Sequence, residues 1–267
     1  MPENFTQNFD YATQSKYFLD AKPFNHLIID NFLLPHVVER VAEEFPVFSD
    51  PGWKIYDNAI EMKKLLNHYD RFGKITYQLF AFLNDRKFIS QLEMLINEPL
   101  YPDIGLNGGG LHTHAKGGKL NVHLDYSIHP KLSLERRINL LIYLSKDWDP
   151  SWGGSLGFWN HDKVTNGPGK LEKQIECFFN RAVIFDTTQN SWHGLPETIL
   201  CPPDRTRNSL AIYYLCKPRP NASARGKALF SPYGDQSDNP EIMELIRKRS
   251  LVDSASTVYE SNKKGKG

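Results

Sequence analysis

The hydrophobic and polar positions divide the chain into a helix-rich part followed by a strand-rich part. In the first hundred residues apolar side chains recur at helical spacing, for example at Val38, Val41 and Phe45, which is typical of a helix that buries one face. A short apolar run over residues 26–30 is instead typical of a strand. The spacing predicts helices over residues 35–45, 74–83 and 88–96.

From about Leu111 onward the period changes, and short apolar runs alternate with turns that contain Gly, Pro and Asn. Many short strands without long helices between them favour antiparallel strands arranged as a barrel or a jelly roll. We therefore expect an α+β fold whose core is a double-stranded β-helix (jelly roll) with N-terminal supporting helices. The predicted strands cover residues 120–126, 137–144, 155–159, 182–185 and 209–215.

This division predicts three regions along the chain. Residues 1–100 are expected to form a mainly helical support region that is integral to the domain, and residues 101–220 the double-stranded β-helix core. Residues 221–267 are expected to form a C-terminal extension, because the chain turns polar after Pro218. Within this extension the sequence predicts one helix over residues 241–249 and a flexible basic tail over residues 261–267.

The composition indicates an ordered globular protein, since 40% of the 267 residues are hydrophobic and 12% are aromatic. Lys and Arg number 32 and Asp and Glu 31, so the net charge of +1 points to neither a nucleic-acid nor a membrane partner. The three cysteines have no CxxC spacing, and the N-terminus lacks an apolar leader segment. We therefore expect free thiols in a reducing compartment and a cytoplasmic protein.

A His-x-Asp pair lies in the first predicted strand of the core. Because side chains on a strand alternate with a period of two, His123 and Asp125 project from the same face. An imidazole and a carboxylate on one face suit a divalent metal ion. The same spacing recurs at His68 and Asp70, but that stretch is polar and lacks an apolar face, so we interpret it as a surface turn.

A third ligand is expected from His193, which follows the apolar run over residues 182–185 and a short turn. Two His and one carboxylate leave three open positions on an octahedral ion, the facial arrangement of non-haem Fe(II) oxygenases. The last predicted strand begins nearby, and alternation places Arg205, Arg207 and Ser209 on one of its faces. A guanidinium that faces into the barrel can bind a carboxylate through two parallel hydrogen bonds, and the hydroxyl of Ser209 supplies another donor.

These motifs make the segment from His112 to Tyr214 similar to the 2-oxoglutarate- and Fe(II)-dependent oxygenases, in the prolyl 4-hydroxylase-like branch. The resemblance rests on five motifs that occur in the family's order: His123-Leu-Asp125, Tyr143-Leu-Ser-Lys-Asp-Trp148, Gly153-Gly154-Ser-Leu156, His193-Gly194 and Arg207-Asn-Ser209. The resemblance implies that His123, Asp125 and His193 bind Fe(II).

The resemblance also implies a binding site for the cosubstrate 2-oxoglutarate. Arg207 would pair with its distal carboxylate, Tyr143 would donate its hydroxyl to the same group, and Ser209 is a weaker second donor. Arg205 is a rival anchor, because Arg207 lies 14 residues after His193, further than is usual in this branch. In place of the family's usual Tyr before the first iron ligand, this chain has His112 and His114 as candidate cosubstrate contacts; both can equally be half-exposed strand residues.

The implied activity is oxidation by O2 with Fe(II) and 2-oxoglutarate, with ascorbate as a candidate reductant. The carboxylate of Asp125 favours hydroxylation, because halogenating relatives carry a small residue there. We expect a hydroxylase that acts on an unactivated C–H bond of a peptide or small molecule, with a prolyl or amino-acid-like target first and a saccharide or other small metabolite second. A cupin-type metalloenzyme without 2-oxoglutarate and a non-catalytic ligand-binding barrel remain as alternatives. Loops 127–136 and 161–173 are expected to border the substrate entrance.

Overall fold

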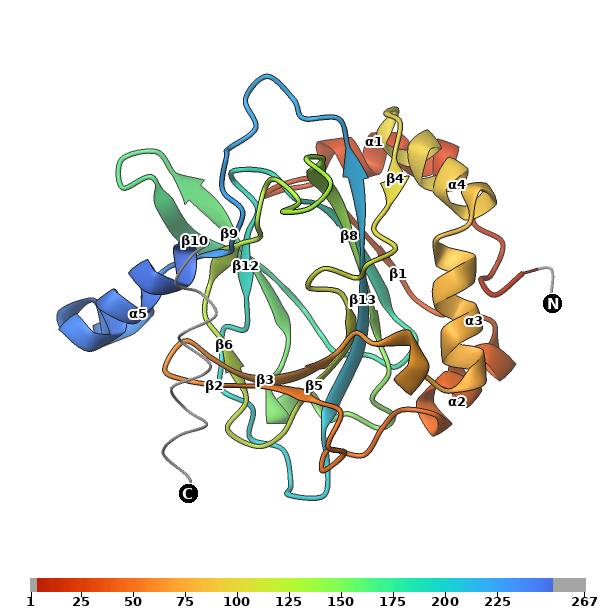
Figure 1. The fold of residues 1–267 in the computed structure, drawn as a ribbon, viewed down its shortest axis with the longest axis horizontal. Helices are drawn as coiled ribbons and strands as arrows, with labels where there is room; N and C mark the ends of the chain where they lie inside the picture. Colours follow the sequence, from red (N-terminus) through yellow and green to blue (C-terminus); the bar gives the residue numbers. More distant parts are fainter. Residues whose placement is uncertain (1–3, 252–267) are drawn as a thin grey trace.

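The computed structural model describes residues 4–251, which form helices and two antiparallel sheets (Figure 1). The larger sheet runs in the order β1 (His26–Ile29), β11 (Ala182–Asp186), β8 (Glu135–Tyr143), β13 (Arg207–Cys216), β5 (Gly110–His114), β3 (Glu61–Leu66) and β2 (Lys54–Asp57), with β4 (Tyr101–Pro102) beside β13 and β6 (Lys119–Leu120) beside β3. The smaller sheet runs β10 (Gly167–Ile175), β9 (Leu156–Asp162), β12 (Trp192–Gly194), β7 (His123–Leu124) and β14 (Leu229–Phe230).

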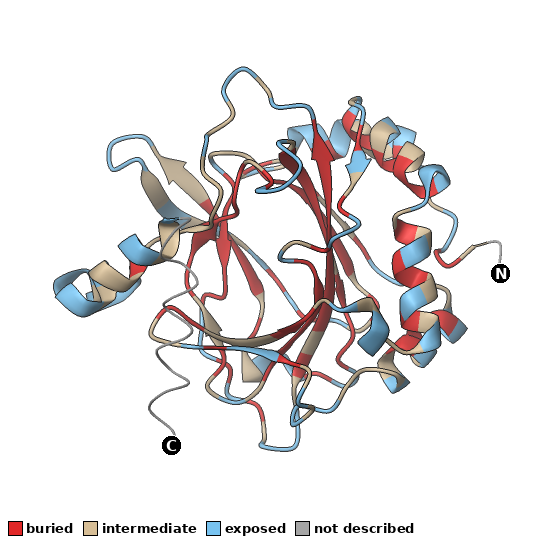
Figure 2. Cartoon of the chain, viewed as in Figure 1, coloured by how far each residue is buried: buried red, intermediate tan, exposed pale blue. Residues whose placement is uncertain are grey.

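One face of the larger sheet is covered by helices. The helices α1 (Tyr11–Asp20), α2 (Pro35–Glu43), α3 (Lys74–Leu83) and α4 (Arg86–Ile96) lie together on one side of the molecule (Figure 1). Even-numbered residues of β8 and β13, such as Leu140 and Ile212, join the helices in one hydrophobic core. Figure 2 shows the buried helix faces turned toward the sheet and the exposed faces turned outward. The apolar faces of the predicted helices and strands therefore pack against each other in one hydrophobic core.

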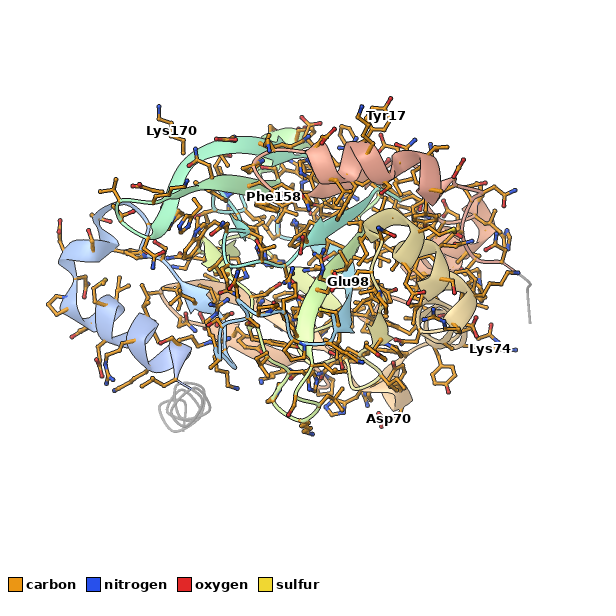
Figure 3. All side chains as sticks on the ribbon, turned by 90° about the horizontal axis from the view of Figure 1, so that it is seen from above. Tyr17, Asp70, Lys74, Glu98, Phe158 and Lys170 are labelled. Carbon is orange, nitrogen blue, oxygen red and sulfur yellow. The ribbon has the colours of Figure 1, made fainter. Side chains whose placement is uncertain are left out.

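The other face of the larger sheet looks toward the smaller sheet. Here Leu141 and Tyr143 of β8 pack in a second hydrophobic cluster with Phe158 of β9. Phe158 is fully buried in the interior, whereas Tyr17 and Lys170 project from the surface (Figure 3). A cavity of about 520 Å³ lies between the two sheets. The alternation in each strand thus supplies one side chain to the helical core and the next to the cavity.

The structure adds elements that the hydrophobic pattern does not predict. Residues 1–100 are not only helical, because β2 and β3 form a hairpin that extends the larger sheet. Its cavity-facing positions include Lys54, Glu61 and Lys63 rather than only apolar residues, so the alternation is hidden. Helix α1 and strand β10 were also not predicted: α1 buries only Tyr11 and Phe18, and β10 is largely exposed. Residues 161–173 therefore lie in the β9–β10 hairpin and do not line the cavity.

The predicted strand over residues 120–126 is interrupted, and its parts lie in different sheets. Leu120 ends β6 in the larger sheet, whereas His123 begins β7 in the smaller one. The side chain of Asn121 consequently turns away from the metal-ligand face and donates to the Ser231 carbonyl oxygen at 3.1 Å. The chain crosses from one sheet to the other here, so its side chains do not alternate between the same two faces over the whole of residues 120–126.

The C-terminal extension packs against the mouth of the cavity. Strand β14 pairs with β7, and α5 (Pro240–Ser250) packs against β14. The predicted helix over residues 241–249 is confirmed within α5, while the predicted basic tail lies outside the described residues. Cys177, Cys201 and Cys216 are all free and buried. Among the residues described, no helix has the length and apolar character needed to cross a membrane.

Candidate metal and cosubstrate site

The pairing of β7 with β12 brings the two predicted histidine ligands together. His123 and His193 are direct partners in the antiparallel register, and their ring centroids lie 4.3 Å apart. Asp125 follows β7, and its two carboxylate oxygens each lie 3.8 Å from one histidine Nε2. The three side chains form a cluster whose ligand atoms all lie within 4.8 Å of one another. His193 therefore lies in a short strand, not merely beyond one as the sequence suggested.

Backbone carbonyl groups fix the orientation of both imidazoles. The Nδ1 of His123 lies 2.9 Å from the Asn121 carbonyl oxygen, and the Nδ1 of His193 lies 2.8 Å from that of Ser191. A carbonyl oxygen only accepts, so each Nδ1 carries the proton and each Nε2 keeps its lone pair for a metal. Burial, and then the neighbouring His193, lowers the pKa of His123 to about 3. Burial and the neighbouring imidazole thus favour the neutral form of His123, which is the form that binds a metal ion.

The Asp125 carboxylate has a cationic partner that the sequence analysis did not identify. Arg136 lies 3.1 Å from Asp125 Oδ1, is 2% exposed, and is sandwiched between the rings of Tyr126 and Tyr213 at 3.5 and 3.4 Å. Burial alone would raise the pKa of Asp125, but the charge of Arg136 holds it well below its usual range. The carboxylate is therefore ionised and oriented before a metal binds.

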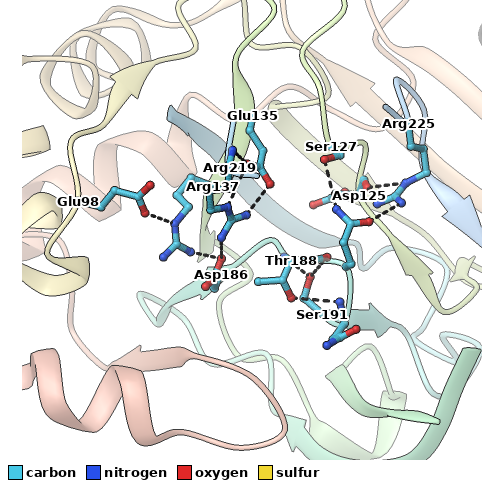
Figure 4. Close-up of polar contacts among 12 residues, drawn as sticks. Glu98, Asp125, Ser127, Glu135, Arg137, Asp186, Thr188, Ser191, Arg219 and Arg225 are labelled. Atoms are coloured by element: carbon cyan, nitrogen blue, oxygen red, sulfur yellow. Dashed lines mark hydrogen bonds and ion pairs between the residues drawn. The ribbon is translucent and has the colours of Figure 1, made fainter. Parts of the chain in front are cut away.

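A second arginine, Arg225, binds the backbone of Asp125. Arg225 donates from Nη2 to the Asp125 carbonyl oxygen at 2.8 Å and from Nη1 to Gln189 Oε1 at 2.9 Å (Figure 4). Gln189 in turn donates to the Ser127 hydroxyl at 3.3 Å. These bonds tie the segment after β7 to the turn before β12. The turn that carries His193 and the segment that carries Asp125 are thus fixed relative to each other.

The predicted cosubstrate residues lie on one row across the larger sheet. Ser209 of β13 is the register partner of His112 on β5 and of Tyr143 on β8, so all three side chains share the face that lines the space between the sheets. Arg207 lies two residues before Ser209 and is 3% exposed. Its guanidinium lies 5.0 Å from the Tyr143 ring centroid. The structure therefore brings these four residues together next to the metal-ligand cluster.

The Gly-Gly turn holds Arg207 in place. Arg207 Nε donates to the Gly154 carbonyl oxygen at 2.6 Å, and Gly153 and Gly154 both have positive φ angles, of 74° and 81°. A Cβ atom on Gly154 would lie only 2.8 Å from Arg207 Cδ. Glycine is required here by both the backbone conformation and the close approach of the arginine stem.

Several buried polar atoms around this cavity have no hydrogen-bond partner. They include Tyr143 Oη, His112 Nε2, Asp125 Oδ2 and both ring nitrogens of His114. Buried polar groups are rarely left unsatisfied. A carboxylate between Arg207 and Tyr143 and a metal ion on Asp125 Oδ2 would satisfy two of them. The residues present therefore fit both Fe(II) and 2-oxoglutarate.

Two expectations about the neighbouring residues need correction. Arg205 is exposed in the turn before β13, because the strand begins at Arg207 and alternation does not reach back to residue 205. It does not line the cavity. His112 and His114 are not half-exposed, since they are only 9% and 3% exposed. Burial, followed by the charges of Lys63 and Arg207, lowers the pKa of His112 to about 3, so it is neutral.

The sequence analysis also missed Arg136 and Lys63, both of which line the cavity. Arg136 begins a strand rich in charged residues, where Glu135 and Arg137 give the same polar pattern. Lys63 lies on the unpredicted β3. Neither residue is part of a recognisable motif, and only the pairing of distant strands places them near Asp125. The second His-x-Asp pair is confirmed as a surface turn, because His68 and Asp70 are exposed (Asp70 in Figure 3).

Comparison with protein families identifies the part of the chain that contains this site. Residues 109–215 match the model described as 2OG-Fe(II) oxygenase superfamily. All five motifs on which the predicted resemblance rests lie within these residues. No curated protein matches the chain.

Solved structures with a similar fold include two prolyl hydroxylases and a protein that was solved with 2-oxoglutarate bound. A prolyl hydroxylase from Trichoplax adhaerens, in complex with a hypoxia-inducible-factor peptide, is 16% identical with a TM-score of 0.55, over 77% of this chain and 90% of that one. A Pseudomonas putida prolyl-4-hydroxylase is 19% identical with a TM-score of 0.52, over 77% and 100%. HygX from Streptomyces hygroscopicus, with nickel, 2-oxoglutarate and hygromycin B bound, is 15% identical with a TM-score of 0.50, over 76% and 86%.

The metal-ligand cluster predicts a specific loss of iron binding. His193→Ala removes one of three ligands, so Fe(II) affinity measured by anaerobic titration should fall by more than the roughly 10–100-fold that loss of an outer partner costs. His68→Ala, in the exposed His-x-Asp pair, is the control and should bind Fe(II) like wild type. Equal iron stoichiometry in His193→Ala and wild type would contradict the assignment.

The Gly-Gly turn predicts a defect in cosubstrate binding without loss of metal. In Gly154→Ala the new Cβ would displace Arg207, and the strained φ should cost about 1–3 kcal/mol. We expect 2-oxoglutarate affinity to fall about tenfold or more at unchanged Fe(II) stoichiometry, measured by equilibrium dialysis. Gly167→Ala is the matched control, because its nearest neighbouring atom lies 3.5 Å from the added Cβ. An unchanged affinity in Gly154→Ala would show that Arg207 does not depend on the turn.

Proposed function

We propose that this chain is a 2-oxoglutarate-dependent dioxygenase of the 2OG-Fe(II) oxygenase superfamily and that it hydroxylates an unactivated C–H bond of a prolyl or amino-acid-like substrate. The observation that carries the oxygenase chemistry is the buried cluster of His123, Asp125 and His193 beside Arg207 and Tyr143. Both the metal ligands and the cosubstrate residues are present, and this argues against the cupin-type and non-catalytic alternatives. A saccharide or other small metabolite remains the second substrate class.

Each residue of the site has a separate task in this proposal. His123, Asp125 and His193 would hold Fe(II), and Arg207 with Tyr143 would hold the distal carboxylate of 2-oxoglutarate. When bound, the metal and the cosubstrate supply the oxidising power from O2. Arg136 keeps Asp125 ionised, and the apolar walls formed by Leu141, Leu156 and Phe185 exclude water from the reacting centre. Ser209 and His112 supply further polar contacts to the cosubstrate.

The substrate class is supported by what similar folds bind. The Trichoplax adhaerens enzyme was solved with a peptide and HygX with hygromycin B, so this architecture accommodates both peptides and small molecules. The cavity of about 520 Å³ lies within the range typical of small-molecule sites. A compact substrate beside 2-oxoglutarate fits such a volume better than a long polymer segment.

We also propose how the chain is organised around this activity. The two sheets would form the double-stranded β-helix of residues 101–220, residues 1–100 would support it, and residues 221–267 would extend it. The helices share one hydrophobic core with the larger sheet, which supports an integral role for the N-terminal region. The free, buried cysteines support a cytoplasmic location, because oxidising compartments favour disulfides.

The test of the substrate class is succinate formation above the background measured without substrate. Proline-containing peptides, free amino acids and sugars should be assayed in parallel with Fe(II), ascorbate and 2-oxoglutarate in air. We expect stimulation by a prolyl or amino-acid substrate and a product that is heavier by about 16 mass units, since one oxygen is added. Stimulation by a sugar alone would replace the prolyl proposal and leave the oxygenase chemistry intact.

The cosubstrate assignment predicts different effects for two neighbouring arginines. Arg207→Met removes a charge-assisted contact to the 2-oxoglutarate carboxylate, so binding should weaken by about 2–4 kcal/mol. This corresponds to roughly 30- to 800-fold in Kd. Arg205→Met is the control and should leave the affinity unchanged, because Arg205 is exposed. The reverse result, with Arg205→Met alone defective, would reassign the anchor.

A further inference from the structure

The mouth of the cavity is built by elements that lie outside the matched residues 109–215. The β2–β3 hairpin contributes Lys54 and Lys63, and the C-terminal extension contributes Lys227 and Arg249. In Figure 1, α5 lies on the side of the molecule opposite the α1–α4 helices, beside the smaller sheet. The residues proposed to hold metal and cosubstrate thus belong to the matched segment, whereas these entrance residues lie outside it.

The charged side chains that line the cavity are mostly cationic. Among the described residues, six Lys or Arg and two Asp or Glu line it. Two of the six are already assigned, since Arg207 faces the cosubstrate and Arg136 pairs with Asp125. The remaining four cations, Lys54, Lys63, Lys227 and Arg249, line the same cavity as Glu61.

Among these cations, Lys63 and Lys227 have little compensation from the carboxylates of the described residues. Lys63 Nζ lies 3.8 Å from Glu61 Oε2, and the same carboxylate lies 3.0 Å from Arg249 Nε. Lys227 makes no ion pair with an acidic side chain in the described part of the chain. Its pKa is lowered by burial and then by the charges of Arg249 and Lys54. Two ammonium groups that line one cavity attract an anionic ligand.

The cationic mouth is close to the metal-ligand cluster. Phe230 stacks on His123, with ring centroids 5.0 Å apart and planes inclined by 27°, and the Arg249 guanidinium lies 5.5 Å from the Phe230 ring. Lys63 shares the cavity-facing side of β3 with Leu65, the register partner of His112. The Lys63 side chain is 16% exposed, so its ammonium reaches the cavity rather than open solvent. An anion bound here would leave the rest of a small molecule next to the metal.

We propose that Lys63 and Lys227 bind an oxyanion of the substrate, a carboxylate or a phosphate, and so make this enzyme specific for small anionic substrates. This inference rests on the proposed function, because it assigns the charge of the molecule to be hydroxylated. A free amino acid carries such a carboxylate, and a phosphorylated sugar carries such a phosphate. The low net charge of the whole chain conceals this local concentration of positive charge.

The test uses inorganic phosphate and 13C-labelled acetate as separate probes of the full-length protein loaded with Fe(II) and saturating 2-oxoglutarate under nitrogen. A probe bound near high-spin Fe(II) should show saturable broadening of its 31P or 13C resonance. We expect broadening by at least one probe, and the stronger binder identifies phosphate or carboxylate as the group recognised. Saturating 2-oxoglutarate keeps the probes from the Arg207 site.

Three variants locate the probe. Lys63→Gln/Lys227→Gln should weaken probe binding at least tenfold, Lys227→Arg should retain it, and Lys170→Gln, on the exposed β9–β10 hairpin, is the control for surface charge. Fe(II) binding and the far-UV circular dichroism spectrum verify that each variant is folded. If the double variant is unfolded, the single Lys227→Gln variant replaces it and should also bind the probe more weakly.

Several outcomes would overturn the inference. They are the absence of saturable broadening with either probe, unchanged broadening in the double variant, and weaker 2-oxoglutarate binding in the folded double variant, which would assign these lysines to the cosubstrate. Failure of the proposed function looks different. Wild-type protein that binds the probe but forms no succinate in the substrate panel would retain the anion site without the hydroxylase activity, whereas succinate formation without probe binding would remove only the anion site.

Discussion

The ion pair between Asp125 and Arg136 is the interaction on which the rest of the site depends. A carboxylate in a cavity between two sheets is costly to bury unless a cation accompanies it. Arg136 meets this need because the rings of Tyr126 and Tyr213 hold its guanidinium from both faces. The pair leaves Asp125 Oδ2 without a hydrogen-bond partner and turned toward His193. The fold therefore prepares one carboxylate oxygen for a metal ion and occupies the other.

A second network of buried charges fixes the strand that carries Arg136. Arg137 contacts both Glu98 and Asp186, and Arg219 binds Glu135 at 2.6 Å (Figure 4). These contacts connect β8 to the end of α4, to β11 and to the segment after β13. Successive charged residues at the start of β8 thus point to opposite faces of the sheet. Arg136 contacts Asp125 on one face, whereas Glu135 and Arg137 on the other face connect the sheet to the neighbouring segments.

The residues that come together at the centre could be predicted from the sequence, because they lie in motifs with fixed local spacing. His123 and Asp125 follow from strand alternation, and the Gly153-Gly154 turn has a conformation that only glycine readily adopts. The helices over residues 74–83 and 88–96 were predicted for the same reason, since each pattern is complete within one segment. Arg205 was placed wrongly because the strand starts two residues later than the alternation suggested.

The entrance could not be predicted, because its residues come together only through long-range pairing. Lys63 lies on a hairpin whose polar positions hide its alternation, and Lys227 lies just before a two-residue strand that forms only against β7. Local spacing therefore predicts the shared centre, and tertiary pairing determines the specific mouth. In this fold the two are physically coupled, since β7 holds His123 on one edge to β12 and on the other to β14. A change in the C-terminal extension would consequently alter both the lining of the cavity mouth and the position of His123.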